Sequence, residues 1–328
     1  VVKCHGVHGI PDVETALQYS CNSYFCKVYN DFIMDSTFAS PAIGYQKWWD
    51  MMSQLGYGKK LGIDLYGEKK GNLPSVKYYN KIFGEGKWKA STIISNSIGQ
   101  GEVLATPLQI ANAMAIIANK GYYYSPRVGR SLIKEHQKLN ITKQKITTNI
   151  DTVFYRYVID GLEKVVLEGT ARGAKIPDIS FCGKTGTAQN PHGKDHSIFS
   201  GFAPKENPKI AIAVFVENAG FGATYAAPIA SLMVEKYLHD TIATKRIPLQ
   251  ERMFKARIIS DDLEVGIPKT PQQLRQDSLA KEKIKKDRIQ AIADSIKTTK
   301  EKKEKESTKN FKPNDAIVKP KEGDIFQE

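Results

Sequence analysis

The chain has 328 residues, of which 41% are hydrophobic, so it can bury one sizeable core or two smaller ones, and a largely disordered protein is excluded. Its formal net charge of +13 is spread along the chain, so charge alone identifies neither a nucleic acid nor an anionic surface as a partner. No apolar run approaches the ~20 residues of a membrane helix, and the first residues contain no apolar signal-peptide region. Nothing in these residues is therefore expected to anchor or export the chain.

Helices are predicted through much of the first half. Between residues 12 and 29 the apolar positions recur at helical spacing, and Asp12 is suited to the N-cap. The polar break Ser20-Cys21-Asn22 predicts two helices joined by an elbow. The stretch 62–75 is rich in Gly and Lys without periodicity and is predicted to be a loop. Residues 106–119 predict an apolar helix with a threonine N-cap and a proline in its first turn.

The third quarter changes from helical to strand periodicity. A helix over 153–167 is followed by three short β-branched or aromatic runs and then by an amphipathic helix over 225–238. The runs lie at 179–182, 197–202 and 210–216. Their close spacing favours an antiparallel meander rather than crossover units. The predicted class is α+β, with helices covering an antiparallel sheet.

The domain organisation follows from the composition. Residues 1–242 are predicted to form the folded domain, and 243–268 a connector. Residues 269–328 are predicted to form a charged, low-complexity tail, in which 278–306 form a solvated helix and 307–328 are disordered.

The four cysteines are expected to be free thiols. They are Cys4, Cys21, Cys26 and Cys182. No Cys-x-x-Cys or Cys-x-x-x-x-His pattern is present, so the sequence predicts neither a redox motif nor a metal site, and no cofactor.

Two short motifs carry the chemical information. Lys184-Thr185-Gly186, followed by Thr187, is the only Lys-Thr-Gly in the chain, and Ser20-Cys21-Asn22 is the only Ser-x-Asn. In serine acyltransferases these motifs act with a Ser-x-x-Lys nucleophile around one carbonyl group. Each motif alone is weak, but their order is correct, with Ser-x-Asn in an elbow and Lys-Thr-Gly at the end of a predicted strand.

With these motifs in place, the chain resembles the class B penicillin-binding proteins, the D,D-transpeptidases that crosslink peptidoglycan, and most closely their elongation-type branch. The resemblance covers about residues 10–240. The matching segments are ALQYSCNSYF, LGIDLYGEKKGNLPS, NSIGQGEVLATPLQIANAMAIIANKG, LEGTARGA, the Lys-Thr-Gly strand and DHSIFSGFAP. The resemblance implies the penicillin-binding transpeptidase fold, which is similar to that of serine β-lactamases.

The resemblance also implies catalytic roles for Ser20, Asn22 and Lys184. Ser20 would relay a proton toward the leaving nitrogen, and Asn22 would bind the amide side chain of the substrate. Lys184 would supply positive charge and organise Ser20.

Three further residues of the same strand take roles on this resemblance. Thr185 would bind the substrate carboxylate, and Gly186 would admit the substrate backbone. The backbone N–H of Thr187 would contribute to the oxyanion hole.

The nucleophile of the family pattern is not found in this chain. In the family it precedes Ser-x-Asn by several dozen residues, and only 19 residues precede Ser20 here. The matches Ser131 to Lys134 and Ser278 to Lys281 both follow Ser20, and about two are expected by chance. We therefore expect that the acylating serine, a membrane helix and two sheet strands precede Val1. A sheet without two strands exposes an edge and an apolar face, so residues 1–328 alone are expected neither to fold stably nor to bind penicillin covalently.

Other functions stay open at this stage. A serine β-lactamase is disfavoured because no Glu-x-x-Leu-Asn deacylation motif is present, and a truncated, non-catalytic cell-wall interaction module is a second alternative. On the resemblance, the expected partners are peptidoglycan stem peptides, β-lactams and a membrane glycosyltransferase of the elongation machinery, with no nucleic acid. The expected location is the periplasmic face of the inner membrane.

Overall fold

The computed structural model describes residues 4, 6, 8–129, 131–134, 137–140, 144–258, 279, 282, 286 and 290, with the backbone alone at 131–134 and 137–140. Contacts divide the chain into two compact units, Val1–Ile258 and Ile259–Glu328, and the elements below belong to the first. No helix within these described ranges combines the length and the apolar character needed to cross a bilayer.

The central element is a three-stranded antiparallel sheet. Strands β5 (Cys182–Ala188), β6 (His196–Ala203) and β7 (Ile210–Val216) follow one another as a meander in the order β5-β6-β7. Thr185 pairs with Phe199, which in turn pairs with Val214. The predicted α+β class and antiparallel meander are confirmed.

The start of this sheet corrects one prediction. The strand expected over 179–182 instead begins at Cys182, so Lys-Thr-Gly lies within β5 and not after it. Glycine has a low strand propensity, so the prediction from local sequence ended this strand before Gly183. Gly183 lies opposite Gly201, and a Cβ on Gly183 would come 2.9 Å from Cε1 of Phe199. Tight packing between β5 and β6 therefore requires glycine at 183, although glycine has a low strand propensity.

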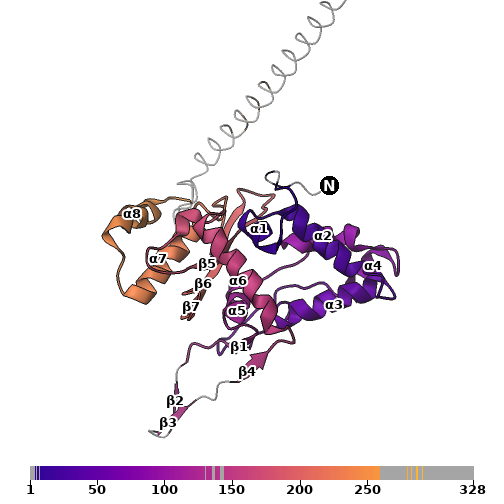
Figure 1. Cartoon of the computed structure of the whole chain (residues 1–328), viewed down its shortest axis with the longest axis horizontal. Coiled ribbons are helices and arrows are strands. Elements are labelled where there is room, and N and C mark those ends of the chain that lie inside the picture. The colour runs from indigo at the N-terminus through magenta and orange to yellow at the C-terminus, as the bar shows by residue number, and fades with distance from the viewer. Residues whose placement is uncertain are drawn as a thin grey trace, which may run out of the picture. The chain divides into compact units, whose positions relative to one another are not determined.

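Helices cover both faces of the sheet. Helix α7 (Ala226–His239) packs on one face, where Ala230 and Val234 share a core with Phe199 of β6. Helix α5 (Pro107–Ala118) packs on the other, where Ile116 shares a second core with Phe202. Figure 1 shows α6 (Thr152–Leu167) crossing in front of β5–β7, and its residues contribute to both cores. The predicted helices over 106–119, 153–167 and 225–238 are confirmed within one or two residues.

The first two helices form the predicted elbow. Helix α1 (Val13–Gln18) begins at Asp12, whose carboxylate accepts a hydrogen bond from the Thr15 N–H at 2.8 Å. Helix α2 (Asn22–Ile33) follows after three residues. Helix α6 packs on the sheet and also contacts α1. The Lys164 ammonium of α6 lies 2.6 Å from the Glu14 carboxylate of α1.

A third, aromatic core was not predicted. It is built by α2, α3 (Pro41–Gln54), α4 (Val76–Phe83) and the 3₁₀ helix Ala90–Ile98. Figure 1 shows α2, α3 and α4 together on the side away from β7. Its buried side chains include Tyr29, Tyr45, Tyr79 and Trp88. Tyrosine and tryptophan side chains bury large apolar areas and also carry a polar atom, so hydropathy alone understates this core.

Two small strand pairs lie between α5 and α6. Strand β1 (Tyr122–Tyr124) pairs with β4 (Lys145–Thr147), and β2 (Ser131–Lys134) pairs with β3 (Gln137–Asn140). None of these four strands was predicted. Three or four residues are too few to show a strand period, so only pairing across the hairpin defines them.

Beyond α7, the chain continues in ordered structure to α8 (Ile247–Lys255). The buried guanidinium of Arg246 donates to the Glu235 carboxylate at 2.7 Å and to the Ser231 hydroxyl at 2.6 Å, which fixes the start of α8 on α7. The region predicted as a connector, 243–268, thus begins with packed residues. The predicted helix over 278–306 and the predicted disorder over 307–328 lie outside the described residues, apart from four helical positions.

Candidate active site

The two motifs identified in the sequence meet in space. The Nζ of Lys184 donates a hydrogen bond to the Ser20 Oγ at 2.8 Å, although the two residues are 164 positions apart. The same ammonium donates to the Thr185 carbonyl oxygen at 3.0 Å. The structure thus gives Lys184 the contact with Ser20 that the motif chemistry requires.

The elbow between α1 and α2 presents Ser20 to Lys184. Ser20 has a left-handed backbone, with φ of +55°. Its N–H bonds to the Leu17 carbonyl at 3.2 Å, and the Cys21 N–H bonds to the Ala16 carbonyl at 2.9 Å, so the end of α1 is closed by backbone bonds. Cys21 is the buried N-cap residue of α2, and Asn22 is the first residue of that helix.

The backbone of β5 faces outward at two motif residues. The Thr185 carbonyl accepts from Lys184, and the Thr187 carbonyl accepts from the Gln100 side-chain Nε2 at 3.0 Å. In an antiparallel pair, the N–H and C=O of one residue point to the same side of the strand. The N–H groups of Thr185 and Thr187 are therefore directed away from β6, toward the edge where β5 is the last strand of the described sheet.

Sequence reasoning did not identify two residues that hold this strand. The Thr185 hydroxyl lies 2.8 Å from the Thr170 hydroxyl, and the Thr170 N–H donates to the Gln18 carbonyl at 3.3 Å. Gln100 holds the carbonyl of Thr187, as described above. Both residues lie in segments that carried the family resemblance, LEGTARGA and NSIGQGE, and that was their only sequence signal.

The glycine of Lys-Thr-Gly is tightly packed against protein. A Cβ on Gly186 would lie 3.2 Å from the Cβ of Ile198, its partner on β6. Gly222, in the segment between β7 and α7, packs over the same strand pair, since a Cβ there would lie 2.6 Å from the Gly186 carbonyl oxygen. Packing against Ile198 leaves little room for a side chain at 186, and the predicted approach of a substrate backbone at this position stays a prediction.

Burial changes the protonation of the active-site lysine. Desolvation disfavours the ammonium and lowers the pKa of Lys184 from 10.5 to about 8. At neutral pH the side chain is therefore mostly charged, and at mildly alkaline pH it becomes a neutral amine that can accept a proton.

We expect Lys184 to titrate with a midpoint near pH 8 in the folded protein. Between pH 8 and 10.5 the unfolded chain binds a proton that the native site has lost, so the free energy of unfolding should rise with pH in this window. Lysine side-chain NMR on the native gene product that contains these residues measures the midpoint. A Lys184 midpoint at the ordinary lysine value of 10.5 would contradict the expectation.

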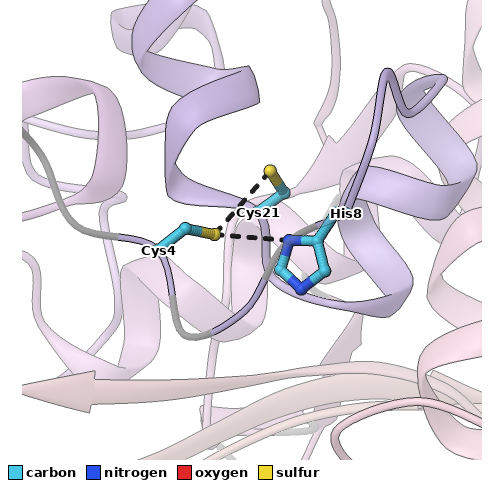
Figure 2. Close-up of side chains that lie close together, drawn as sticks. All are labelled: Cys4, His8 and Cys21. Atoms are coloured by element: carbon cyan, nitrogen blue, oxygen red, sulfur yellow. Dashed lines mark hydrogen bonds between the residues drawn. The ribbon is translucent and has the colours of Figure 1, made fainter.

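A second group of side chains lies beside Ser20. The Cys4 Sγ is 3.3 Å from the His8 Nδ1 and 3.8 Å from the Cys21 Sγ, as Figure 2 shows. Partial burial opposes ionisation of both thiols, and it raises the pKa of Cys21. For Cys4, backbone N–H groups of Ser23 and Asn22 outweigh burial and lower the pKa. We call this group the Cys4–His8–Cys21 cluster, and among the described residues it alone offers three potential metal-ligand atoms within 4.8 Å of one another.

The spacing of these three residues in the sequence does not indicate that they form a cluster. The elbow after α1 brings Cys21 back onto Cys4 and His8, so two residues 17 positions apart in the chain have their sulfur atoms 3.8 Å from each other. The sequence prediction of no metal site rested on motif spacing alone and did not consider this proximity.

One of the two rejected Ser-x-x-Lys matches falls within the described residues. Ser131 and Lys134 are the two ends of strand β2, not neighbours on successive turns of a helix. Ser278 and Lys281 lie outside the described residues.

Comparison with known proteins agrees with this geometry. The penicillin binding protein transpeptidase domain matches residues 3–235. The peptidoglycan D,D-transpeptidase MrdA of Acinetobacter baumannii is 34% identical over 260 residues, which cover 74% of this chain and 36% of that protein. The chain thus spans about a third of that relative's length.

Solved structures show the same likeness. PBP2 of Pseudomonas aeruginosa, in complex with WCK 5153, has a TM-score of 0.60 and 30% identity, over 72% of this chain and 51% of that one. A chain from a peptidoglycan synthase complex that coordinates polymerization and crosslinking has a TM-score of 0.58 and 26% identity, over 72% and 39%. Because the family match includes both motifs that meet at Ser20 and Lys184, this chain belongs to the penicillin-binding protein transpeptidase family.

Proposed function

We propose that this chain supplies the proton-transfer and substrate-binding side of a peptidoglycan D,D-transpeptidase. The observation that carries the proposal is the 2.8 Å hydrogen bond from the Lys184 Nζ to the Ser20 Oγ. In the proposed reaction a serine attacks the carbonyl of the penultimate D-Ala, and the terminal D-Ala leaves as an amine after it gains a proton. An amine of a neighbouring strand then attacks the ester, loses a proton, and releases the serine.

Ser20 is positioned to deliver the proton to the leaving amine. Its hydroxyl accepts a hydrogen bond from Lys184, so its own proton is free to point toward a substrate. Lys184 has a pKa of about 8, close enough to neutrality to replace that proton and to be recharged from solvent. Asn22, one residue beyond the elbow, is assigned to the substrate's amide side chain.

The outer edge of β5 is assigned to the substrate backbone. An extended stem peptide that adds to this edge as a further strand would meet the outward N–H groups of Thr185 and Thr187. The Thr187 N–H is assigned to the oxyanion that forms in each acyl-transfer step. The Thr185 hydroxyl, held by Thr170, is assigned to the substrate carboxylate beside the positive charge of Lys184.

A solved relative supports one of the proposed partners. The solved synthase complex couples polymerization to crosslinking, so we propose a peptidoglycan glycosyltransferase as the partner of this protein during cell elongation. β-Lactams are proposed as inhibitors, because they mimic the stem peptide at such sites. The proposed location is the periplasmic face of the inner membrane, where this substrate is found.

Covalent labelling tests this function. We expect the native gene product to retain a fluorescent penicillin after denaturation, and residues 1–328 alone to retain none. The reason is that the one Ser-x-x-Lys match among the described residues, Ser131 to Lys134, lies on a strand, whereas the motif needs its two residues one helical turn apart. Label on residues 1–328 would contradict this assignment, and label on neither protein would contradict the transpeptidase proposal.

Hydrolysis of a β-lactam distinguishes the transpeptidase from the two alternative functions, a serine β-lactamase and a non-catalytic cell-wall module. A transpeptidase holds the acyl group for long periods, whereas a β-lactamase would hydrolyse a chromogenic cephalosporin continuously. A non-catalytic cell-wall module would show neither labelling nor turnover by the native gene product.

A further inference from the structure

We propose that the side chain of Gln100 occupies the substrate's place on the outer edge of β5, and that a stem peptide or a penicillin displaces it before acylation. The Gln100 Nε2 donates to the Thr187 carbonyl at 3.0 Å, although the two residues are 87 positions apart. This inference rests on the proposed transpeptidase function, because it concerns the same strand edge. It adds a competing residue that the proposed chemistry does not contain.

The hydrogen bonds of an antiparallel pair show which substrate group Gln100 replaces. In a bonded pair, two opposite residues exchange both of their backbone hydrogen bonds. A substrate residue whose attacked carbonyl accepts from the Thr187 N–H therefore offers its own N–H to the Thr187 carbonyl. In the stem peptide this residue is the penultimate D-Ala. In a penicillin the equivalent groups are the β-lactam carbonyl and the acylamino N–H.

The side chain of Gln100 is chemically equivalent to the group that it replaces. A glutamine NH₂ is a neutral amide donor, as a peptide N–H is, so its bond to Thr187 reproduces one bond of an added strand. It also covers part of a strand edge that has no further neighbour in the described sheet. Binding of the substrate exchanges one amide donor for another at the same carbonyl oxygen.

The backbone around Gln100 is fixed, so the displacement involves the side chain. Gln100 follows the 3₁₀ helix Ala90–Ile98 and lies between Gly99 and Gly101, whose φ values are +71° and +76°. Its N–H donates to the Ser95 carbonyl at 3.0 Å, which closes the end of that helix. Gln100 is half-buried, so its side chain borders solvent and can rotate toward it while the turn stays in place.

The expected consequence is a slower acylation than the site would otherwise support. A bond that the free enzyme makes and the transition state lacks lowers the second-order rate constant of acylation. Removal of the Gln100 donor should therefore raise this constant by about two- to tenfold, the usual net effect of one neutral hydrogen bond on an equilibrium. The gain should be confined to substrates whose N–H binds the Thr187 carbonyl.

Matched variants of the native gene product measure this effect. Gln100→Met keeps the length of the side chain and removes its N–H donors, whereas Gln100→Ala removes the side chain beyond Cβ. We expect benzylpenicillin to acylate both variants about two- to tenfold faster than the wild type. Gln250→Met, at an exposed position of α8, is the control and should react at the wild-type rate.

A β-lactam without the acylamino group distinguishes competition from a general change in the site. A carbapenem carries a hydroxyethyl group at this position and offers no N–H to Thr187, so its rate of acylation should be equal in all four proteins. A benzylpenicillin rate that is unchanged or lower in both Gln100 variants would overturn this proposal alone, as would an equal gain with the carbapenem. A wild-type protein that neither β-lactam acylates would overturn the transpeptidase proposal, and this one with it.

Discussion

Replacement of Lys184 by alanine is expected to slow acylation of the native gene product by penicillin by about 10²–10³-fold, the usual loss when one preorganised electrostatic group is removed from an active site. The reason is the pair of bonds from its Nζ, to the Ser20 Oγ at 2.8 Å and to the Thr185 carbonyl at 3.0 Å. Without the ammonium, Ser20 loses its proton source and the site loses its cation. Time courses of fluorescent penicillin labelling measure the effect.

The melting temperature of the Lys184→Ala variant distinguishes slower acylation from misfolding. The ammonium of Lys184 is desolvated, as its pKa of about 8 indicates, so its removal should not lower the melting temperature. Lys194→Ala, at an exposed position in the turn before β6, is the matched control and should label at the wild-type rate. A Lys184→Ala protein that acylates normally would refute the assignment of this lysine.

Gly222→Ala is expected to destabilise the protein by about 1–3 kcal/mol or more, the range of an overpacked core, and to reduce acylation with it. An alanine Cβ would lie 2.6 Å from the Gly186 carbonyl oxygen and 3.1 Å from its nitrogen, and would also overlap the Ile198 carbonyl. The segment cannot easily move away, because the buried Ser197 hydroxyl bonds to the Phe221 carbonyl at 2.9 Å and accepts from the Ala226 N–H at 3.1 Å. We therefore expect the added Cβ to displace β5.

Chemical denaturation and penicillin labelling of the native gene product test this together. Gly173→Ala is the control, because a Cβ at Gly173 meets no atom within 4 Å, and its effect should stay within about 0.5 kcal/mol. Equal stability of the two variants would show that Gly222 is not needed for the packing of β5.

The amino-acid sequence determined the elements that have clear local signals. Asp12 and Thr106 cap their helices through their own side chains, and apolar spacing marked the helices that follow. The runs of β-branched and aromatic residues in β6 and β7 could also be predicted, because turn residues bound them and both faces of these strands contact a core. The motif residues Ser20 and Lys184 could be selected because serine, lysine and glycine in these patterns carry a known chemistry.

Only the tertiary structure decided how distant segments meet. The strand β5 was predicted too short, because the glycines required by its contacts with β6 and Gly222 weaken any local strand signal. Gln100 and Thr170 support the Lys-Thr-Gly strand through single hydrogen bonds that leave no pattern in sequence. Cys4 and Cys21 come together because a left-handed residue at Ser20 turns the chain back. Local periodicity reports which side of an element is buried, but the partner on that side is fixed by long-range packing, and the site is made of such partners.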